Sequence, residues 1–201
     1  MLTKRDIIFS AVTGFYTGFI VWRIFEFLEV PRFNGTSFVW LVVLVPVLWV
    51  LGVGLGYFLG RWFLFFRQFG KFAAIGFTNA AVDFGILNFL IFYFSITAGV
   101  FFSVFKSVSF VGAAIHSYFW NKYWAFSAGA TSISGQEFLK FFSVTVIALL
   151  INVAAASVVV NLIGPQFGLS PKVWANIGAV VGSAVALIAS FVGFKKVVFK
   201  K

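Results

Sequence analysis

The stretch that decides the fold is residues 38–60, FVWLVVLVPVLWVLGVGLGYFLG, an apolar run of 23 residues without a charged side chain. A helix rises about 1.5 Å per residue and a bilayer core is about 30 Å thick, so about 20 such residues cross it. Five further runs meet or approach this criterion: residues 7–25, 72–94, 102–120, 141–163 and 173–194. The sequence therefore predicts an all-α integral membrane protein of about six transmembrane helices.

The composition of the whole chain supports this interpretation. Hydrophobic residues make up 62% of the chain and charged residues only 10%, whereas soluble domains are about half apolar and a quarter charged. The first run is the weakest, because Arg23 and Glu26 crowd its outer end, and a helix lying on the membrane surface is the alternative for it. Pro46 lies inside the second run, where neighbouring helices can satisfy the carbonyl that it frees.

The net charge of +10 comes from basic residues at the ends of the apolar runs, which indicates attraction to lipid headgroups rather than to nucleic acid. If both termini are cytoplasmic, eleven basic residues lie inside and four outside, as the positive-inside rule requires. The inside set is Lys4, Arg5, Arg61, Arg67, Lys71, Lys122, Lys140, Lys195, Lys196, Lys200 and Lys201, and the outside set is Arg23, Arg32, Lys106 and Lys172. We expect a multi-pass protein of the cell membrane, with Trp40, Trp62, Trp120, Trp124 and Trp174 near its interfaces.

The second part of the chain contains an internal repeat. Phe-x-Lys-Phe opens the third run at residues 69–72 and the fifth at residues 138–141, and in each exit a Lys stands four residues before a Phe. Each copy is a two-helix hairpin of the same membrane orientation, so the repeat is parallel. We predict two copies, residues 69–126 and 138–199, within a four-helix domain of residues 69–201, preceded by a two-helix extension of residues 1–68.

The motifs of this repeat resemble those of the GtrA-like family, which includes the membrane domain of some dolichyl-phosphate mannose synthases. The opening Phe69-x-Lys-Phe72 is followed by Gly76, Asn79 and Asp83, and residues 118–126, YFWNKYWAF, are similar to the exit of the family's second helix. Ala125 stands where Thr is usual, and Phe194 stands where many members have Asn. The resemblance covers about two thirds of the chain and leaves the first 68 residues outside it.

The resemblance implies a role with polyprenyl-phosphate-linked sugars in the synthesis of cell-surface polysaccharides or glycans. The expected function is translocation of such a sugar across the membrane. The alternatives are a non-transporting anchor that recruits a glycosyltransferase and a purely structural membrane subunit. The expected partners are membrane lipid, the lipid-linked sugar and, under the second hypothesis, a glycosyltransferase.

Asp83 is the sharpest single signal in the apolar runs. It lies about 11 residues, or about 16 Å, into its run, where a carboxylate faces a bundle interior or a wet cavity. Asn79 lies one turn away on the same face. Either these two residues contact a polar headgroup or cation, or Asp83 is protonated or paired and holds helices together. Asn152 occupies the register of Asp83 in the second repeat and is expected to face it.

Two further polar residues lie on the fourth run. His116, the only histidine, is expected at the depth of Asn79 and within reach of a hydrogen bond to it, the alternative being a packing role. Lys106 lies about one turn inside the outer end and is expected to extend its ammonium outward, the alternative being an ion pair with Asp83. Asn88 is expected to point elsewhere, and Asn176 to make a hydrogen bond between helices.

The cytoplasmic edge gathers a basic cluster that would offer several donors to a lipid phosphate, the alternative being ordinary positive-inside anchors. Its members are Lys71, Asn121, Lys122, Lys140, Lys195 and Lys196. Together with Asn79, Asp83, His116 and Asn152, all of these but Lys196 form the predicted substrate-binding set. The headgroup would enter at the lysines and pass the polar residues while its tail stays in lipid.

The sequence lacks the patterns of catalysis. It contains no cysteine, nucleotide-phosphate loop, nucleophile elbow or zinc motif, so we expect no enzyme activity, catalytic residue, metal or cofactor. Glycines four residues apart, Gly14 and Gly18 on the first run and Gly52, Gly56 and Gly60 on the second, predict faces for close helix packing. Such faces would dock the first two helices onto the rest or onto a second copy of the chain.

Overall fold

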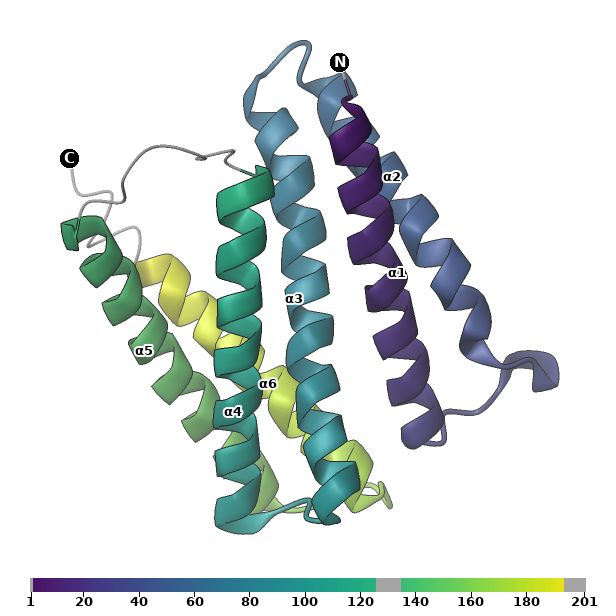
Figure 1. The fold of residues 1–201 in the computed structure, drawn as a ribbon. Helices are drawn as coiled ribbons and strands as arrows, with labels where there is room; N and C mark the ends of the chain where they lie inside the picture. Colours follow the sequence, from purple (N-terminus) through teal and green to yellow (C-terminus); the bar gives the residue numbers. More distant parts are fainter. Residues whose placement is uncertain (1, 126–134, 194–201) are drawn as a thin grey trace. The chain divides into compact units, whose positions relative to one another are not determined.

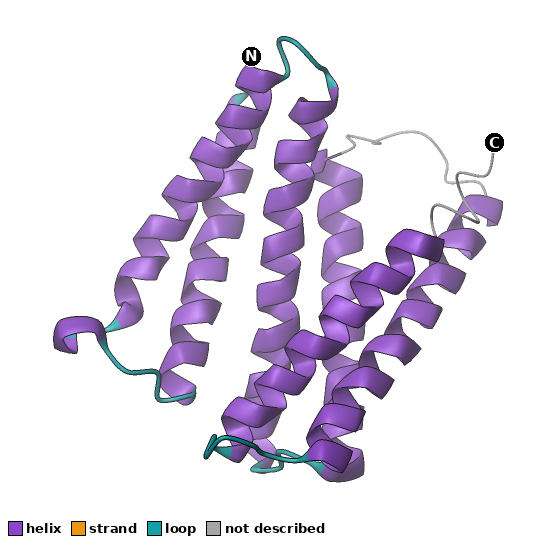
Figure 2. Ribbon diagram, turned by 180° about the vertical axis from the view of Figure 1, so that it is seen from behind, coloured by secondary structure: helices purple, strands orange, loops and turns teal. Residues whose placement is uncertain are grey.

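The computed structural model describes residues 2–125 and 135–193, without the side chains of residues 33, 135–141, 144 and 187–193. Figures 1 and 2 show that the regular structure of these residues is helical and that short loops join the helices. The six α-helices are α1 (Lys4–Phe27), α2 (Leu41–Leu59), α3 (Phe65–Phe94), α4 (Gly99–Trp120), α5 (Gly135–Ser157) and α6 (Pro171–Gly193). Two π-helical turns, Asn121–Ala125 and Val158–Ile163, extend α4 and α5.

The predicted all-α membrane fold is confirmed. Within the described residues, five helices are long and apolar enough to cross a bilayer, and each overlaps one of the predicted runs. The sixth predicted run, residues 173–194, corresponds to α6. Helix α1 packs along α2 at three levels, through Asp6 with Tyr57, Gly14 with Pro46 and Gly18 with Leu41, which favours a spanning helix over one lying on the membrane surface.

Contacts divide the chain into two compact units, each described here by itself. Unit 1 contains residues 1–85 and 112–130, and unit 2 contains residues 86–111 and 131–201. The long helices α3 and α4 each contribute one half to either unit. The expected domain boundary at residue 68 and the two repeat copies stay predictions, because packing groups the residues in a different way.

Helices α1 and α2 of unit 1 lie side by side (Figure 1), and glycines let their backbones touch. A Cβ atom on Gly14 would lie 2.5 Å from the Cα of Pro46, and one on Gly18 would collide with the backbone of Leu41. These contacts fit the close-packing role expected of both residues. On α2, Gly56 approaches the carbonyl oxygen of Phe66 in the same way, whereas a Cβ on Gly52 would meet nothing within 4 Å. The Gly52 carbonyl oxygen lies 3.4 Å from the position of a Cβ on Gly70 of α3, so Gly52 borders the close approach of the two helices while its own Cβ position is open.

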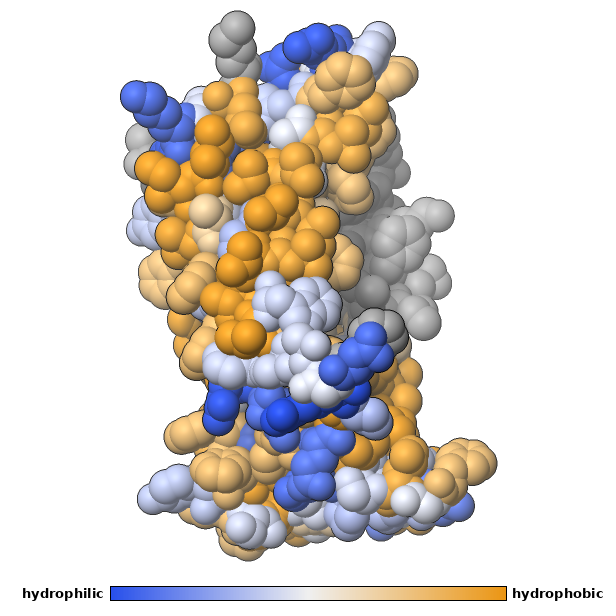
Figure 3. Space-filling view, turned by 90° about the vertical axis from the view of Figure 1, so that its right-hand side faces the viewer, coloured by the Kyte–Doolittle hydropathy of each residue, from blue (hydrophilic) through white to orange (hydrophobic). Residues whose placement is uncertain are grey.

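The outer surface of the first two helices is apolar. Val43, Leu51 and Leu55 of α2 are between 56% and 70% exposed. Figure 3 shows this surface in orange, with hydrophilic residues in blue above and below it. Such a band is what contact with hydrocarbon requires of a helix pair in a bilayer.

Unit 2 is joined by polar contacts between its helices. Asn88 of α3 and Asn176 of α6 exchange two hydrogen bonds, of 2.7 and 2.8 Å, between their side-chain amides. The structure thus confirms that Asn176 forms a hydrogen bond between helices. Ser103 of α4 bonds Ser157 of α5 at 2.6 Å, and α6 packs along α5. These reciprocal bonds satisfy polar groups that hydrocarbon cannot.

Candidate lipid-headgroup site

One end of unit 1 is organised around the carboxylate of Asp6, which is only 2% exposed. Asp6 occupies the first turn of α1 in a capping box with Thr3, whose hydroxyl donates to it at 2.7 Å. The Tyr57 hydroxyl of α2 donates at 2.8 Å and the Trp124 indole at 3.1 Å. The Lys71 ammonium of α3 forms an ion pair with the same carboxylate at 2.7 Å. Four donors from four parts of the chain therefore meet at one charge.

Asp6 is not among the residues predicted for the site. A signal was present, because Thr3-Lys4-Arg5-Asp6 has the spacing of a capping box, which places an acidic side chain at the start of a helix. The partners could not be read in the same way, since Tyr57 lies 51 residues away and Trp124 lies 118 residues away. The Trp124 side chain is 1% exposed and bonded to Asp6, so it packs within unit 1, and its depth near the membrane interface stays a prediction.

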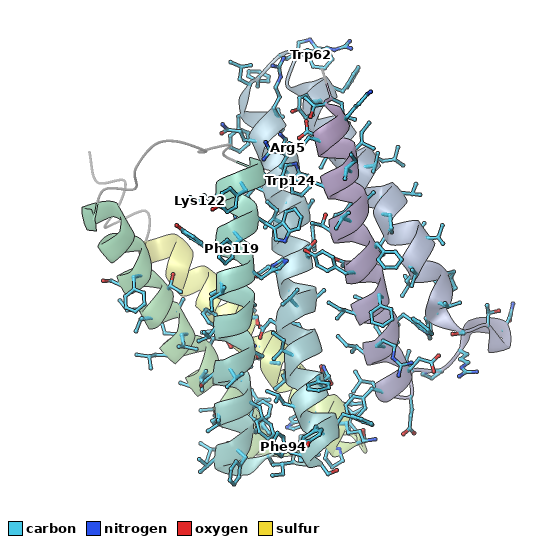
Figure 4. All side chains as sticks on the ribbon, in the orientation of Figure 1. Arg5, Trp62, Phe94, Phe119, Lys122 and Trp124 are labelled. Carbon is cyan, nitrogen blue, oxygen red and sulfur yellow. The ribbon has the colours of Figure 1, made fainter. Side chains whose placement is uncertain are left out.

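Lys71 has a different environment from the one expected of a phosphate ligand. Its side chain is 12% exposed, and its ammonium is held by Asp6 and lies 5.4 Å from the centre of the Tyr57 ring. The positive charge of Lys71 is thus largely neutralised within the protein. Arg5 donates to the carbonyl of Tyr123, and Figure 4 shows Arg5 and Trp124 together between α1 and the end of α4. We refer to this region as the Asp6 end of unit 1.

Lys122 and Asn121 lie in the π-helical turn at the Asp6 end. The ammonium of Lys122 lies 5.6 Å from the ring centres of Tyr118 and Tyr123, and Figure 4 places it on the side of α4 away from α1. Asn121 donates to the carbonyl and the hydroxyl of Ser117, at 2.9 and 3.0 Å. π-Helical turns are rare and frequently occur at functional sites.

The other predicted cations are not described. Lys140 lies in α5, but its side chain is outside the described residues, and Lys195 and Lys196 lie beyond residue 193. The proposed gathering of Lys71, Lys122, Lys140 and Lys195 at one phosphate therefore stays a prediction. Of its members, the structure describes two side chains, and only Lys122 is not held in an ion pair.

Helix α1 turns a polar face into unit 1. Asp6, Ser10, Thr13 and Thr17 recur every three or four residues and are each less than 5% exposed. Thr17 donates to the hydroxyl of Thr78 on α3 at 3.1 Å, and Thr13 donates to the carbonyl of Phe9 at 2.7 Å. A helix with apolar outer and polar inner faces is the reverse of a soluble amphipathic helix, and it lines a polar interior within a lipid-exposed unit.

His116 lies deeper in unit 1, but its partner differs from the expected one. Its Nε2 atom and the Tyr16 hydroxyl of α1 are 2.6 Å apart. The expected hydrogen bond between His116 and Asn79 does not form, because the Nδ1 of His116 and the Oδ1 of Asn79 are both buried without a hydrogen-bond partner. Since α1 was treated as an addition to the site, Tyr16 was not considered as a partner.

Unpartnered polar atoms concentrate in the predicted site. Six buried side-chain atoms of the described residues lack a hydrogen-bond partner, and four of them belong to the predicted set. These four are the Nδ1 of His116 and the side-chain oxygens of Asn79, Asn121 and Asn152. More than nine in ten buried polar groups in proteins are hydrogen-bonded, and an unmade bond costs about 1–3 kcal/mol. Each of these atoms can therefore make a hydrogen bond that no described residue supplies.

Asp83 and Lys106 are both buried, with exposures of 6% and 0%. The expectation that Lys106 extends its ammonium outward is thus wrong. Neither side chain is without a partner. Asp83 belongs to unit 1 and Lys106 to unit 2, so an ion pair between them stays a prediction.

Asn152 lies on α5 in unit 2 and is 2% exposed. Its amide nitrogen donates to the hydroxyl of Ser183 on α6 at 3.3 Å. The expected arrangement of Asn152 facing Asp83 also stays a prediction, since the two residues belong to different units. Unit 1 thus holds Lys71, Asn79, Asp83, His116, Asn121 and Lys122 of the predicted set.

Comparison with known proteins gives one family match. Searches of curated proteins and of solved structures found no match. The family model of the GtrA/DPMS transmembrane domain matches residues 71–199, which cover most of the chain and include every predicted site residue. Members are membrane proteins of glycan biosynthesis. With a match of this extent, the chain belongs to the GtrA/DPMS transmembrane domain family.

Proposed function

We propose that this protein moves a polyprenyl-phosphate-linked sugar across the membrane. The observation that carries the proposal is the set of unpartnered polar atoms on Asn79, His116 and Asn121, all within unit 1. At about 1–3 kcal/mol each, three unmade hydrogen bonds are a large fraction of a protein's stability. A sugar offers hydroxyl groups that can donate to the two amide oxygens and bond the imidazole nitrogen.

The positions of these residues along their helices indicate the order in which a headgroup would meet them. We infer that the Asp6 end of unit 1 faces the cytoplasm, as the distribution of basic residues favours. Asn121 lies at that end, and His116 lies five residues, or about 7.5 Å, further along α4. Asn79 lies eight residues, or about 12 Å, beyond Lys71 on α3. A headgroup would meet Lys122 and Asn121 first, then His116 and Asn79, while its tail stays in lipid.

A transport assay in reconstituted vesicles tests the proposal. Lipid-linked sugar is placed in both leaflets, and its access to an impermeant sugar-cleaving enzyme is followed over time. We expect Asn79→Leu to slow transfer by about tenfold, the equivalent of one lost hydrogen bond at about 1.4 kcal/mol. Ser107→Ala is the control, because the Ser107 hydroxyl is already satisfied by the carbonyl of Ser103. Equal rates for empty vesicles and vesicles with the protein would refute transport.

A second function, recruitment of a glycosyltransferase without transport, is favoured by one surface. Four consecutive residues at the start of α3 and just before it are all more than 60% exposed: Trp62, Phe63, Leu64 and Phe65. Four consecutive exposed apolar residues beside Arg61 form a docking surface for a partner at the membrane interface. Copurification of a glycosyltransferase that is lost on Trp62→Ser and Phe63→Ser, together with no transfer by the protein alone, would favour this function.

A further inference from the structure

An apolar groove runs between α2 and α3 on the surface of unit 1, with a volume of 270 Å³. Gly52, Gly56 and Gly70 lie along it, and Trp49, Phe66 and Phe77 are among the larger side chains that line it. Its lining on α2 extends from Leu48 to Leu59, which is about 16 Å of helix. The groove therefore covers about half the thickness of a bilayer core.

Glycines open this groove, because they carry no side chain to fill it. Gly56 and Gly70 bring the backbones of α2 and α3 close together, because a Cβ on Gly70 would lie 3.3 Å from the Cα of Gly56. One turn away on α2, a Cβ on Gly52 would meet nothing within 4 Å. Gly52 thus leaves space that no neighbouring helix fills. In a bilayer such space is in contact with hydrocarbon chains, so its natural occupant is a lipid chain.

A half-buried cation, Arg67, lies near one end of the groove, next to the lining residue Phe66. Arg67, in the first turn of α3, packs its side chain against Gly60, one turn beyond Gly56 on α2. The Nε atom of Arg67 is buried without a hydrogen-bond partner. A guanidinium is a fork of donors that matches the oxygens of a phosphate. Arg67 and the groove together therefore complement a lipid. The guanidinium can bind the phosphate, and the groove can hold the hydrocarbon chain along α2 and α3.

We infer that this groove binds a single-chain isoprenoid phosphate, with the chain between α2 and α3 and the phosphate at Arg67. The volume lies just below the roughly 300–1,000 Å³ of ligand pockets that hold drug-sized molecules, so it accommodates a segment of one chain. The choice of an isoprenoid deepens the proposed function and rests on it. The binding of a chain in the groove rests only on the geometry.

This lipid site is distinct from the polar path. The path is lined by residues of α1, α3 and α4, whereas the groove is lined by residues of α2 and α3, and the two adjoin where the Trp49 indole donates to Thr78 at 3.0 Å. A lipid that is held by its chain and phosphate in the groove would remain beside unit 1 during repeated transfers. The extension before the family match thus supplies half of a substrate-lipid site.

Equilibrium titration of the full chain in detergent, followed by native mass spectrometry, tests the inference with a long-chain polyprenyl monophosphate as the probe. Gly52→Leu fills the groove without a backbone clash, and we expect it to weaken binding by about tenfold. Gly54→Leu is the matched control, since a Cβ there also meets nothing within 4 Å but Gly54 does not line the groove. Its binding should change by less than about twofold.

Arg67→Gln tests the phosphate contact on the other helix, and we expect it to weaken binding by about tenfold. Arg61→Gln is its control and should leave binding unchanged, because Arg61 lies over the Phe58 ring and Arg67 lies against Gly60. Equal effects of Gly52→Leu and Gly54→Leu, or of Arg67→Gln and Arg61→Gln, would overturn the site. Equal binding of phosphatidylglycerol would overturn the isoprenoid choice. If the protein does not accelerate transfer in vesicles but Gly52→Leu still weakens lipid binding, transport is refuted and the groove site stands.

Discussion

Replacement of Asp6 by Asn tests whether the buried ion pair holds unit 1 together. The substitution keeps the size of the side chain and removes its charge, leaving the Lys71 ammonium, 12% exposed, without its carboxylate. Removing one partner of a buried pair costs about 3–5 kcal/mol, because the remaining charge is uncompensated. We therefore expect Asp6→Asn to lower the free energy of unfolding by about 3–5 kcal/mol.

A double-mutant cycle separates the pair from the other bonds of Asp6. Lys71→Met alone should cost about as much as Asp6→Asn, and the double variant should cost clearly less than the sum, with a coupling energy of about 2–3 kcal/mol. The surface pair of Arg32 and Glu26 is the matched control, with side chains 55% and 27% exposed and a separation of 3.5 Å. Its coupling should be no more than about 1 kcal/mol.

The free energies come from unfolding in mixed micelles with increasing dodecyl sulfate, followed by tryptophan fluorescence. Trp124 is bonded to Asp6, so its emission should report the loss of this end of unit 1. A coupling energy for Asp6 and Lys71 as small as that for Glu26 and Arg32 would refute the reasoning. The Asp6 cluster would then be a set of surface contacts that solvent replaces.

Three further substitutions are measured by the same unfolding assay. Gly14→Leu places a Cβ 2.5 Å from a backbone atom of α2, and we expect it to cost at least about 1–3 kcal/mol, whereas an unchanged stability would mean that α1 and α2 do not pack closely. Tyr16→Phe removes the hydrogen bond between Tyr16 and His116 and should lower the free energy of unfolding by about 1–3 kcal/mol. Asn176→Leu removes both hydrogen bonds to Asn88 and should lower the free energy of unfolding by about 1–3 kcal/mol. Adding Asn88→Leu should restore most of this loss, because two apolar side chains need no hydrogen-bond partner.

The helices could be predicted from the sequence because a bilayer imposes a simple rule of length and polarity. The run at residues 38–60 became a turn and α2, and the run at residues 72–94 became the later part of α3. The beginning of α3 was missed by seven residues, since Phe65 to Lys71 mixes aromatic and basic residues that hydropathy assigns to the interface. A helix continues through such a segment because its backbone hydrogen bonds do not depend on hydropathy.

The candidate site was predicted in part. Asn79, His116, Asn121 and Asn152 stood out as polar residues in or beside apolar runs, and each has a buried atom without a hydrogen-bond partner. The partners were not predictable, because the Tyr16–His116 bond joins residues 100 apart and depends on which helices are neighbours. A single sequence indicates which face of a helix is polar, but it does not indicate which other helix packs against that face.

The glycines show the same limit at smaller scale. Gly52 and Gly56 have the same spacing pattern and were assigned the same packing role, yet Gly56 touches the backbone of α3 and Gly52 borders an open groove. The difference arises from where α3 passes α2, which spacing within α2 does not specify. A small-residue pattern therefore predicts that a helix can be approached closely, and the neighbour's path decides where that happens.

The family match begins at Lys71, and the first matched residue is already bonded to Asp6 of the extension. Thr78 and His116, also within the match, are bonded to Thr17 and Tyr16 of α1. In hydrocarbon each of these groups would need another partner if α1 were absent, because lipid offers no hydrogen bonds. The first two helices are therefore part of the interior of unit 1, and a family member without them must satisfy or replace the same polar positions by other means.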